Sequence, residues 1–187
     1  MEKELKIKTA DHKLIYGTFG ASKVRADTLV IFVHGYTGHQ NEHILFNGAR
    51  FLTEKGFDTF RFNLYAGEGK NARHFRDTKI SLHGEDITTV AKHFRKKYKK
   101  IYIIGHSYGG VSLLFADQSI IEGFIFWDAS YINPKDATEN LKYDKNLDAY
   151  ILDWGMGIIV GKGFINELKK FQSCSNLIKK ITSPCFL

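Results

Sequence analysis

The sequence predicts an α/β protein built on a doubly wound, mostly parallel sheet. Short apolar runs alternate with segments of helical periodicity along most of the chain. The runs 28–33, 101–104 and 123–127 are almost continuously apolar, which is typical of strands covered on both faces. The length of 187 residues fits a single domain, and the sequence shows no internal repeat.

Each expected element follows from a local pattern. In chain order the sequence predicts an antiparallel hairpin with apolar segments from Leu5 and Leu14, a strand at 28–33, a helix at 42–55, a strand at 57–64, a helix at 81–98, a strand at 101–104, a helix after Gly110 and a strand at 123–127. The first helix places Leu45, Ala49 and Leu52 on one face and ends at Gly56.

The net charge of +7 raises the question of a nucleic-acid partner, because six of the nine residues 92–100 are Lys or Arg. A helix explains this charge better. Ile87, Val90 and Phe94 share its buried face, and the cations gather near its C-terminus, where the helix dipole favours them. Since no nucleic-acid-binding motif accompanies the charge, we expect no nucleic-acid partner.

The remaining bulk features indicate a cytoplasmic protein. The charged start of the chain is unlike a secretory signal, and no apolar run is long enough for a bilayer, so no membrane partner is expected. Cys174 and Cys185 are the only cysteines, which argues against a disulfide framework. We expect neither a metal nor a cofactor. The segment 67–70 lacks the first glycine and the Ser/Thr of a phosphate-binding P-loop.

The most informative segment is Gly105-His106-Ser107-Tyr108-Gly109, which joins an apolar strand to an amphipathic helix. This is the strand–turn–helix setting of a G-x-S-x-G nucleophile elbow. The turn is tight, so Gly105 and Gly109 are needed where strand and helix approach without room for a Cβ. We therefore predict Ser107 as a nucleophile with a strained backbone, and we expect the side chain of His106 to point away from it.

A second motif, Val33-His34-Gly35-Tyr36-Thr37-Gly38, follows the strand at 28–33. Together the two motifs resemble the α/β-hydrolase superfamily, in particular its small esterase and serine aminopeptidase-like branch, which includes feruloyl esterase-like enzymes. The segments Asn41-Glu42-His43, Arg61-Phe62-Asn63-Leu64 and Gly67-Glu68-Gly69 also resemble that branch. The likeness extends from about residue 14 to the end of the chain.

The resemblance implies roles for several residues. Ser107 would be the nucleophile, and the backbone N–H groups of Tyr36 and Tyr108 would form the oxyanion hole. His34 would order the oxyanion loop rather than transfer a proton. The expected substrate-binding residues are His34, Gly35, His106 and Trp154. The substrate would be a small acyl ester, and the aromatic residues Tyr131, Tyr143, Tyr150, Trp154 and Phe164 suggest an apolar or aromatic acyl group.

The expected organisation is one domain, 1–187, with a core at 1–130, a cap or lid at 131–180 and the start of another core strand at 181–187. We expect the cap to consist of short, aromatic-rich helical pieces between about Tyr143 and Phe171. The strand would lie beside 123–127 as a parallel edge. In the family, the acid and the histidine of the triad follow that strand, so the resemblance implies a C-terminally incomplete member with an open sheet edge that favours self-association.

His106 is the last histidine of the sequence, and the triad order is Ser, then acid, then His. Asp128 is a candidate substitute acid, although a structural Asp at a strand end is the more ordinary interpretation. His39 and His43 are candidate bases that we do not favour. The leading hypothesis is a carboxylesterase-type serine hydrolase that is nearly inactive as this chain alone. The alternative is a non-catalytic binding protein with the same fold.

Overall fold

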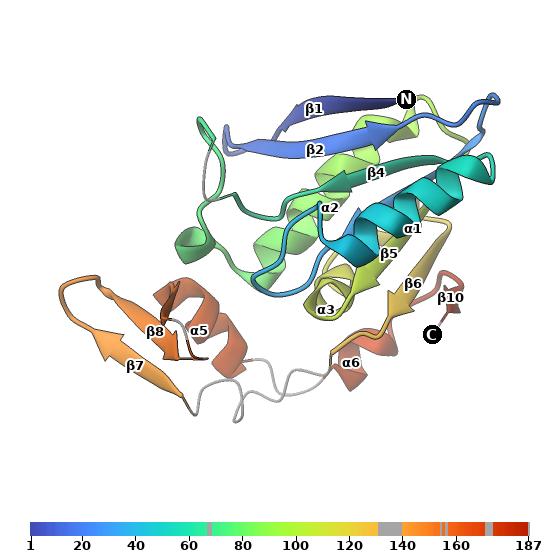
Figure 1. The fold of residues 1–187 in the computed structure, drawn as a ribbon. Helices are drawn as coiled ribbons and strands as arrows, with labels where there is room; N and C mark the ends of the chain where they lie inside the picture. The colour runs from blue at the N-terminus through green and yellow to red at the C-terminus, as the bar shows by residue number, and fades with distance from the viewer. Residues whose placement is uncertain (67–68, 131–139, 154, 156, 171–173, 187) are drawn as a thin grey trace.

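The computed structural model describes residues 1–66, 69–130, 140–153, 155, 157–170 and 174–186. Its main sheet has seven strands in the order β1-β2-β4-β3-β5-β6-β10 (Figure 1). Their bounds are β1 Glu2–Lys8, β2 Leu14–Gly20, β3 Thr28–Val33, β4 Asp58–Phe62, β5 Lys100–His106, β6 Gly123–Trp127 and β10 Cys185–Phe186. β1 and β2 form the expected antiparallel hairpin, β2 is antiparallel to β4, and all other neighbours are parallel. The mostly parallel α/β fold is confirmed.

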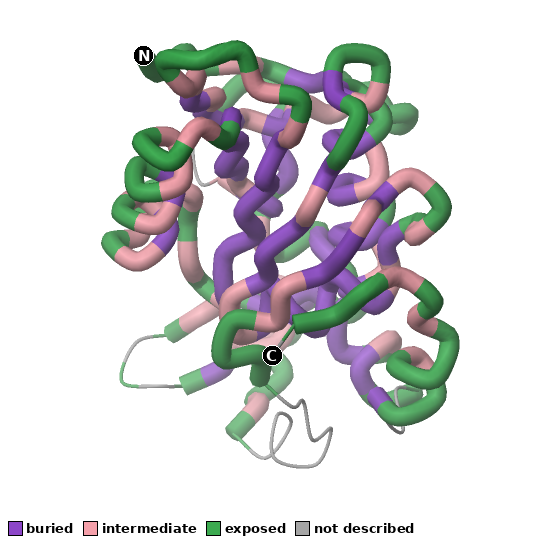
Figure 2. Tube along the Cα trace, turned by 90° about the vertical axis from the view of Figure 1, so that its right-hand side faces the viewer, coloured by how far each residue is buried: buried purple, intermediate pink, exposed green. Residues whose placement is uncertain are grey.

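Helices cover both faces of this sheet. The helical segments of the core are α1 His43–Glu54, η1 Phe75–Asp77, α2 Ile80–Arg95, α3 Tyr108–Leu113, η2 Gln118–Ile120 and α6 Ser175–Ile178. On one face, Leu45 and Ala49 of α1 pack on Val30 and Phe32 of β3. On the other face, α2 and α3 cover the larger part of the core. Figure 2 shows the central strands as the most buried part of the molecule.

The basic residues near the end of α2 are largely paired with carboxylates of neighbouring segments. The pairs are Lys92 with Asp117, Arg95 with Glu122, Lys97 with Asp58 and Lys99 with Asp27. All four cationic side chains are at least partly exposed, so each pair adds little to stability. Much of the positive charge of 92–100 is thus compensated locally.

The segment expected to form a helical cap is mostly a small antiparallel sheet, so that prediction is wrong except for one helix. The cap elements are β7 Leu141–Asp144, β8 Ala149–Asp153, β9 Gly157–Val160 and α5 Lys162–Lys170. The reason is a period of two: Leu152 and Val160 are buried, whereas their neighbours Ile151 and Ile159 lie on the other face. Asp148, with φ of 48°, closes the turn between β7 and β8. Figure 1 shows this cap at the lower left, apart from the main sheet.

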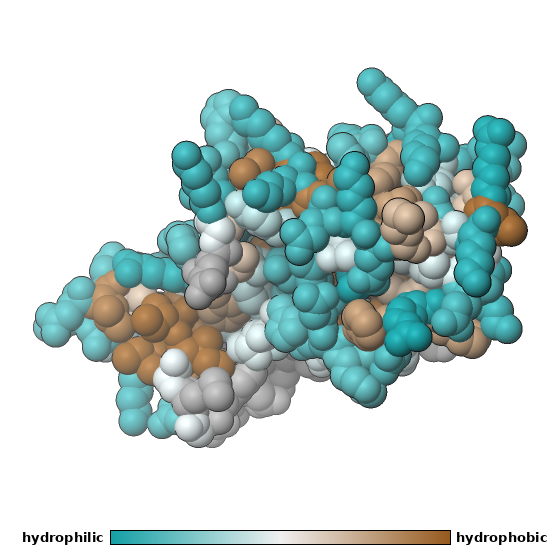
Figure 3. Space-filling model, turned by 45° about the horizontal axis from the view of Figure 1, so that its top comes forward, coloured by the Kyte–Doolittle hydropathy of each residue, from teal (hydrophilic) through white to brown (hydrophobic). Residues whose placement is uncertain are grey.

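Helix α5 attaches the cap to the core. Its apolar face buries Phe164, Ile165 and Leu168. The carboxylate of Glu167 accepts hydrogen bonds from the backbone N–H of Ser81, at 3.0 Å, and from the Ser81 hydroxyl. A carboxylate at the N-terminus of α2 is favourable because the N–H groups there lack partners within the helix. The outer surface of the cap carries apolar residues (Figure 3), among them Ile159, which is 40% exposed.

β10 lies beside β6 with Cys185 opposite Phe124 and Phe186 opposite Ile125. The expected short parallel edge at the end of the chain is therefore confirmed for residues 185 and 186. Among the described residues, no helix has the length and apolar character needed to cross a membrane.

Candidate active site

Ser107 sits in the tight turn between β5 and α3, with φ of 52° and ψ of −121°. This is the strained backbone that the sequence predicted. A Cβ at Gly105 would lie 2.7 Å from backbone atoms of Gly109 and Gly110, and a Cβ at Gly109 would lie 2.5 Å from the carbonyl oxygen of Val33. Both glycines are therefore required by close backbone packing, as expected.

Backbone hydrogen bonds hold this turn against the end of β6. The N–H of Ser107 donates to the carbonyl of Trp127 at 3.2 Å. The carbonyl of Ser107 accepts from the N–H of Gly110 at 3.0 Å and from the N–H of Ser130 at 3.2 Å. The side chain of Ser107 is half-buried, and its Oγ lies 2.8 Å from Oγ of Ser130. The hydroxyl is thus oriented and still accessible.

The loop after β3 lies against this serine. A Cβ at Gly35 would be 3.3 Å from Cβ of Ser107, so the backbone of the loop passes directly beside it. His34 is fully buried. Its Nε2 accepts from the N–H of Leu64 at 3.0 Å, which leaves Nδ1 to donate to the carbonyl of Gly35 at 2.8 Å. Burial lowers the pKa of His34 to about 4, so it is neutral and holds the loop.

The rings of Tyr36 and Tyr108 form an aromatic cluster beneath the site. Their centroids are 5.4 Å apart, and Phe164 of α5 lies 5.6 Å from Tyr36 and 6.0 Å from Tyr108. The hydroxyl of Tyr108 is 2.9 Å from Nδ1 of His83. Burial raises the pKa of both tyrosines, so their phenols stay protonated. The cap therefore contacts the side chains whose backbone amides are the predicted oxyanion donors.

The sequence alone did not predict two residues that contact the site, Ser130 and His83. Ser130 follows β6 by three residues, and only the pairing of β5 with β6 brings it to Ser107. His83 is fully buried on α2, and burial lowers its pKa to about 3. Its spacing from Ile80, Ile87 and Val90 already placed it on the buried face of the helix, which is the one signal that could have marked it.

Other predicted residues are not gathered around Ser107. The ring of His106 lies 6.4 Å from that of Trp127, and it makes no hydrogen bond to Ser107, as expected. Asp128 is exposed, with φ of 47°, and no hydrogen bond within the described chain ties it to a histidine. Trp154 and Tyr131 lie outside the described residues.

All eight histidines of the chain lie in the described ranges, and none is hydrogen-bonded to Ser107. The two candidate bases are engaged near α1. Nδ1 of His39 accepts from the N–H of Asn41 at 3.1 Å, and the ring of His43 contacts the side-chain amide of Asn47. Among the described residues, the serine is thus accompanied by the backbone of the Gly35 loop and by Ser130, and by no hydrogen-bonded histidine.

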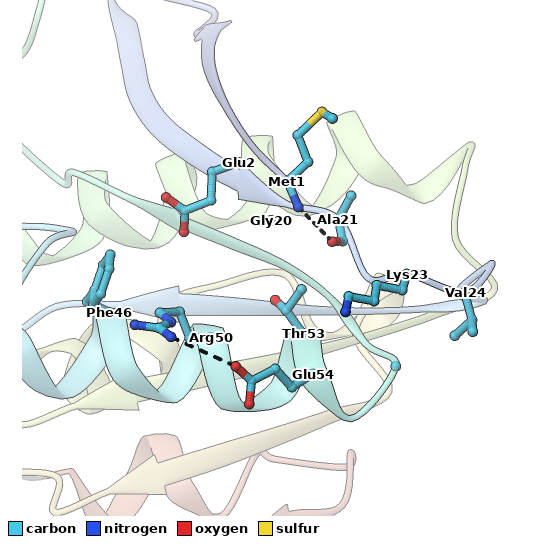
Figure 4. A pocket seen from close by; sticks show the side chains of 11 residues that line it. Met1, Glu2, Gly20, Ala21, Lys23, Val24, Phe46, Arg50, Thr53 and Glu54 are labelled. Carbon is cyan, nitrogen blue, oxygen red and sulfur yellow. Dashed lines mark hydrogen bonds and ion pairs between the residues drawn. The ribbon is translucent and has the colours of Figure 1, made fainter.

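Two cavities help to locate a binding site. One, of about 650 Å³, lies between α1 and the ends of β1 and β2, and its lining includes Glu2, Lys23, Arg50 and Glu54 (Figure 4). None of the predicted site residues lines it. The other, of about 360 Å³, is largely apolar and is lined in part by Ser130, the neighbour of Ser107. Of these two cavities, the second is the one whose lining includes a residue in contact with Ser107.

The fold and the serine turn define an α/β hydrolase, and sequence comparison places the chain within that class. Residues 24–132, more than half of the chain, match the family model described as serine aminopeptidase, S33. The chain belongs to this family and is by family a hydrolase. No curated protein is significantly similar to it.

Solved structures agree with this assignment. Est1E from Butyrivibrio proteoclasticus is 23% identical with a TM-score of 0.76, and the match covers 97% of this chain and 75% of that one. The structure of Est1E with ferulic acid bound is 25% identical with a TM-score of 0.77, covering 97% and 76%. The esterase Pf2001 of Pyrococcus furiosus is 21% identical with a TM-score of 0.70, covering 100% and 70%.

Proposed function

We propose that this chain carries the nucleophile and the oxyanion loop of a carboxylesterase-type serine hydrolase. Ser107 Oγ attacks the carbonyl carbon of a small ester, the alcohol leaves, and water releases the acid from the acyl-enzyme. The observation that supports this best is the Ser107 turn itself. Its φ is 52°, and the backbone of Gly35 passes so close that a Cβ there would be 3.3 Å from Cβ of Ser107.

In this proposal the amides of Tyr36 and Tyr108 stabilise the oxyanion that forms during attack. Such donors are worth about 3 kcal/mol each when they are aimed at the developing charge. The rings of both residues are packed against Phe164 of α5. The hydroxyl of Ser130 orients Ser107 Oγ but is no stronger a base than Ser107 itself, so it does not remove the proton.

The missing base determines the rate we expect. Loss of the histidine from a serine triad lowers kcat by roughly a million-fold and leaves only oxyanion and binding effects. We therefore expect a polypeptide of residues 1–187 to hydrolyse esters very slowly. In this proposal, full activity needs a general base and an acid that the described residues do not place beside Ser107. Asp128 gains no catalytic role here, because no histidine of the described chain is hydrogen-bonded to it.

The proposed substrate is a small ester with an apolar or aromatic acyl group. The cap brings Phe164 to Tyr36, and the rings of Tyr143 and Tyr150 pair at 5.3 Å on the cap sheet. Ferulic acid, the molecule bound in one Est1E structure, is of this aromatic class. The cytoplasm remains the proposed location.

The test compares residues 1–187 with the same chain extended by a family-type C-terminal segment that bears an acid loop and a histidine loop. With p-nitrophenyl acetate, the short chain should show negligible turnover and the extended chain a rate higher by several orders of magnitude. Ser107→Ala should abolish the gain, whereas Ser119→Ala, an exposed serine on η2, should preserve it. Fast turnover by the short chain that depends on Ser107 would refute the proposal that its base is missing.

One observation favours the alternative of a non-catalytic binding protein: no histidine is hydrogen-bonded to Ser107. If the extended chain folds and binds ester analogues but gains no turnover that depends on Ser107, the binding function is the better description.

A further inference from the structure

His83 is a fully buried histidine of α2 that takes no part in the proposed mechanism. Its ring lies edge-on to that of Tyr108, with centroids 5.6 Å apart, and its Nδ1 is 2.9 Å from the Tyr108 hydroxyl. Burial lowers the pKa of His83 to about 3 and raises the pKa of Tyr108, so both side chains are uncharged. Because the phenol is the better donor of the pair and the imidazole nitrogen the better acceptor, the Tyr108 hydroxyl donates to Nδ1.

The other ring nitrogen of His83 is unpaired. Nε2 is buried and makes no hydrogen bond within the described part of the chain. An unpaired buried N–H destabilises a fold, whereas Leu at this position would share the apolar face with Ile80 and Ile87 without that cost. Packing alone therefore does not explain a histidine here, and its distinctive contribution is the hydrogen bond between Nδ1 and Tyr108.

Close backbone packing holds α2 against α3 next to this histidine. A Cβ at Gly84, the residue after His83, would lie 2.5 Å from the carbonyl oxygen of Phe115, two residues beyond the end of α3. The backbones of α2 and of the segment after α3 are therefore in direct contact. The hydrogen bond from Tyr108 to His83 joins the same two helices at the other end of α3, where that helix begins.

Tyr108 carries one of the two predicted oxyanion amides, and its side chain is held on several sides. Its hydroxyl is bonded to His83, and its ring packs against Tyr36 and Phe164, with centroids at 5.4 and 6.0 Å. Aromatic contacts allow a ring to slide, whereas a hydrogen bond fixes the hydroxyl in distance and direction. The amide belongs to the peptide that joins Tyr108 to Ser107, so a shift of the Tyr108 backbone changes the aim of this N–H.

We infer that His83 is a positioning residue for the oxyanion hole: it holds the Tyr108 hydroxyl so that the Tyr108 amide points beside Ser107 Oγ. The inference rests on the proposed function, because it takes that amide as an oxyanion donor. Loss of a donor lowers kcat by about 100- to 1000-fold, and misalignment of a donor that is still present costs less. We therefore expect loss of the Nδ1 bond to weaken anion binding about tenfold and to leave binding of a neutral analogue nearly unchanged.

Anion binding does not need the triad histidine, so the test uses the 187-residue chain. Equilibrium dialysis at pH 7.5 measures the affinity for 4-nitrophenyl methylphosphonate, a tetrahedral monoanion, and for 4-nitroacetanilide, a stable neutral analogue of the ester. The readout is the ratio of the two affinities, which a purely structural role of His83 would not change. Thermal melts of every variant show whether it folds.

His83→Leu removes the accepting nitrogen, and Tyr108→Phe removes only the hydroxyl. Each should lower the ratio about tenfold, and the double variant should lose no more than either single one, because both remove the same bond. His83→Asn keeps an acceptor near the position of Nδ1 and should restore the ratio to within about threefold of the wild type. His93→Leu is the matched control, because His93 is exposed on the same helix and its ring contacts Phe94.

An unchanged ratio in folded His83→Leu or in Tyr108→Phe would refute the inference, and so would equal losses for the anion and the neutral analogue. In those cases a wild type that prefers the anion still supports the proposed oxyanion hole. If the wild-type chain binds the phosphonate no better than the anilide, the oxyanion assignment itself is wrong and the role of His83 falls with it. The nucleophile is tested separately, by the dependence of turnover on Ser107 in the extended chain.

Discussion

The contact between β5 and α3 at Gly105 permits a quantitative test of the serine turn. In Gly105→Ala the new Cβ would lie 2.7 Å from the carbonyl carbon of Gly109 and from the nitrogen of Gly110, and 2.8 Å from the carbonyl oxygen of Gly109. All three atoms belong to the backbone, which cannot rotate away as a side chain can. Overpacking costs about 1–3 kcal/mol, and we expect the upper end of that range here.

For a chain of this length, 1 kcal/mol changes Tm by about 2–4 °C, so Gly105→Ala should lower Tm by about 6–12 °C in a thermal melt followed by circular dichroism. Gly163→Ala is the control, because the nearest atoms to its Cβ would be those of the flexible Lys79 side chain, at 3.6 Å or more. Since Gly163 is the second residue of α5 and has room for a Cβ, the control should not melt below the wild type. If Gly105→Ala melts within about 1 °C of the wild type, the helix is not seated on the strand as described, and the positioning of Ser107 would need another explanation.

Burial lowers the pKa values of His34 and His83 to about 4 and about 3, so below pH 6.5 the unfolded chain binds more protons than the folded chain. The free energy of unfolding should therefore fall by about 1.4 kcal/mol per histidine between pH 7.5 and pH 5.5 in urea melts. If His34→Gln does not reduce this loss, the prediction is wrong. Arg73→Met removes the buried partner of the Asp86 carboxylate, whose side chain is only 2% exposed. The free energy of unfolding, measured in urea, should fall by about 3–5 kcal/mol, and a loss below about 1 kcal/mol would mean that the ion pair is dispensable. Phe186 on the β10 edge is 57% exposed, so the chain should self-associate at micromolar concentration in sedimentation velocity. Phe186→Lys should shift the chain toward monomer, whereas a monomeric wild type would show that the edge is protected.

The sequence determined those elements whose signal is local. The apolar run 28–33 and the helix faces of 42–55 and 81–98 are periodic patterns, and they appear as β3, α1 and α2 with ends shifted by at most three residues. The serine turn was equally predictable, because its glycines answer a steric requirement between segments adjacent in sequence.

The cap shows where a local signal was misjudged. Its aromatic residues suggested helical pieces, yet the alternation through Leu152, Ile158 and Val160 follows a strand period, and these residues complete a buried face only when three short strands pair. Such short segments are ambiguous by periodicity alone, so the cross-strand pairing decided their conformation.

The composition of the site was decided by tertiary structure. Ser130 reaches Ser107 because β6 pairs with β5. Phe164 reaches Tyr36 and Tyr108 because α5 packs on the core. No spacing in the sequence encodes either contact. The identity of the nucleophile and its turn was set by residues next to one another in the chain. The hydroxyl, the rings and the apolar cavity around it came from segments up to 78 residues away in the sequence, since Cys185 lines the cavity. Only the packing of the sheet and cap brings these segments together.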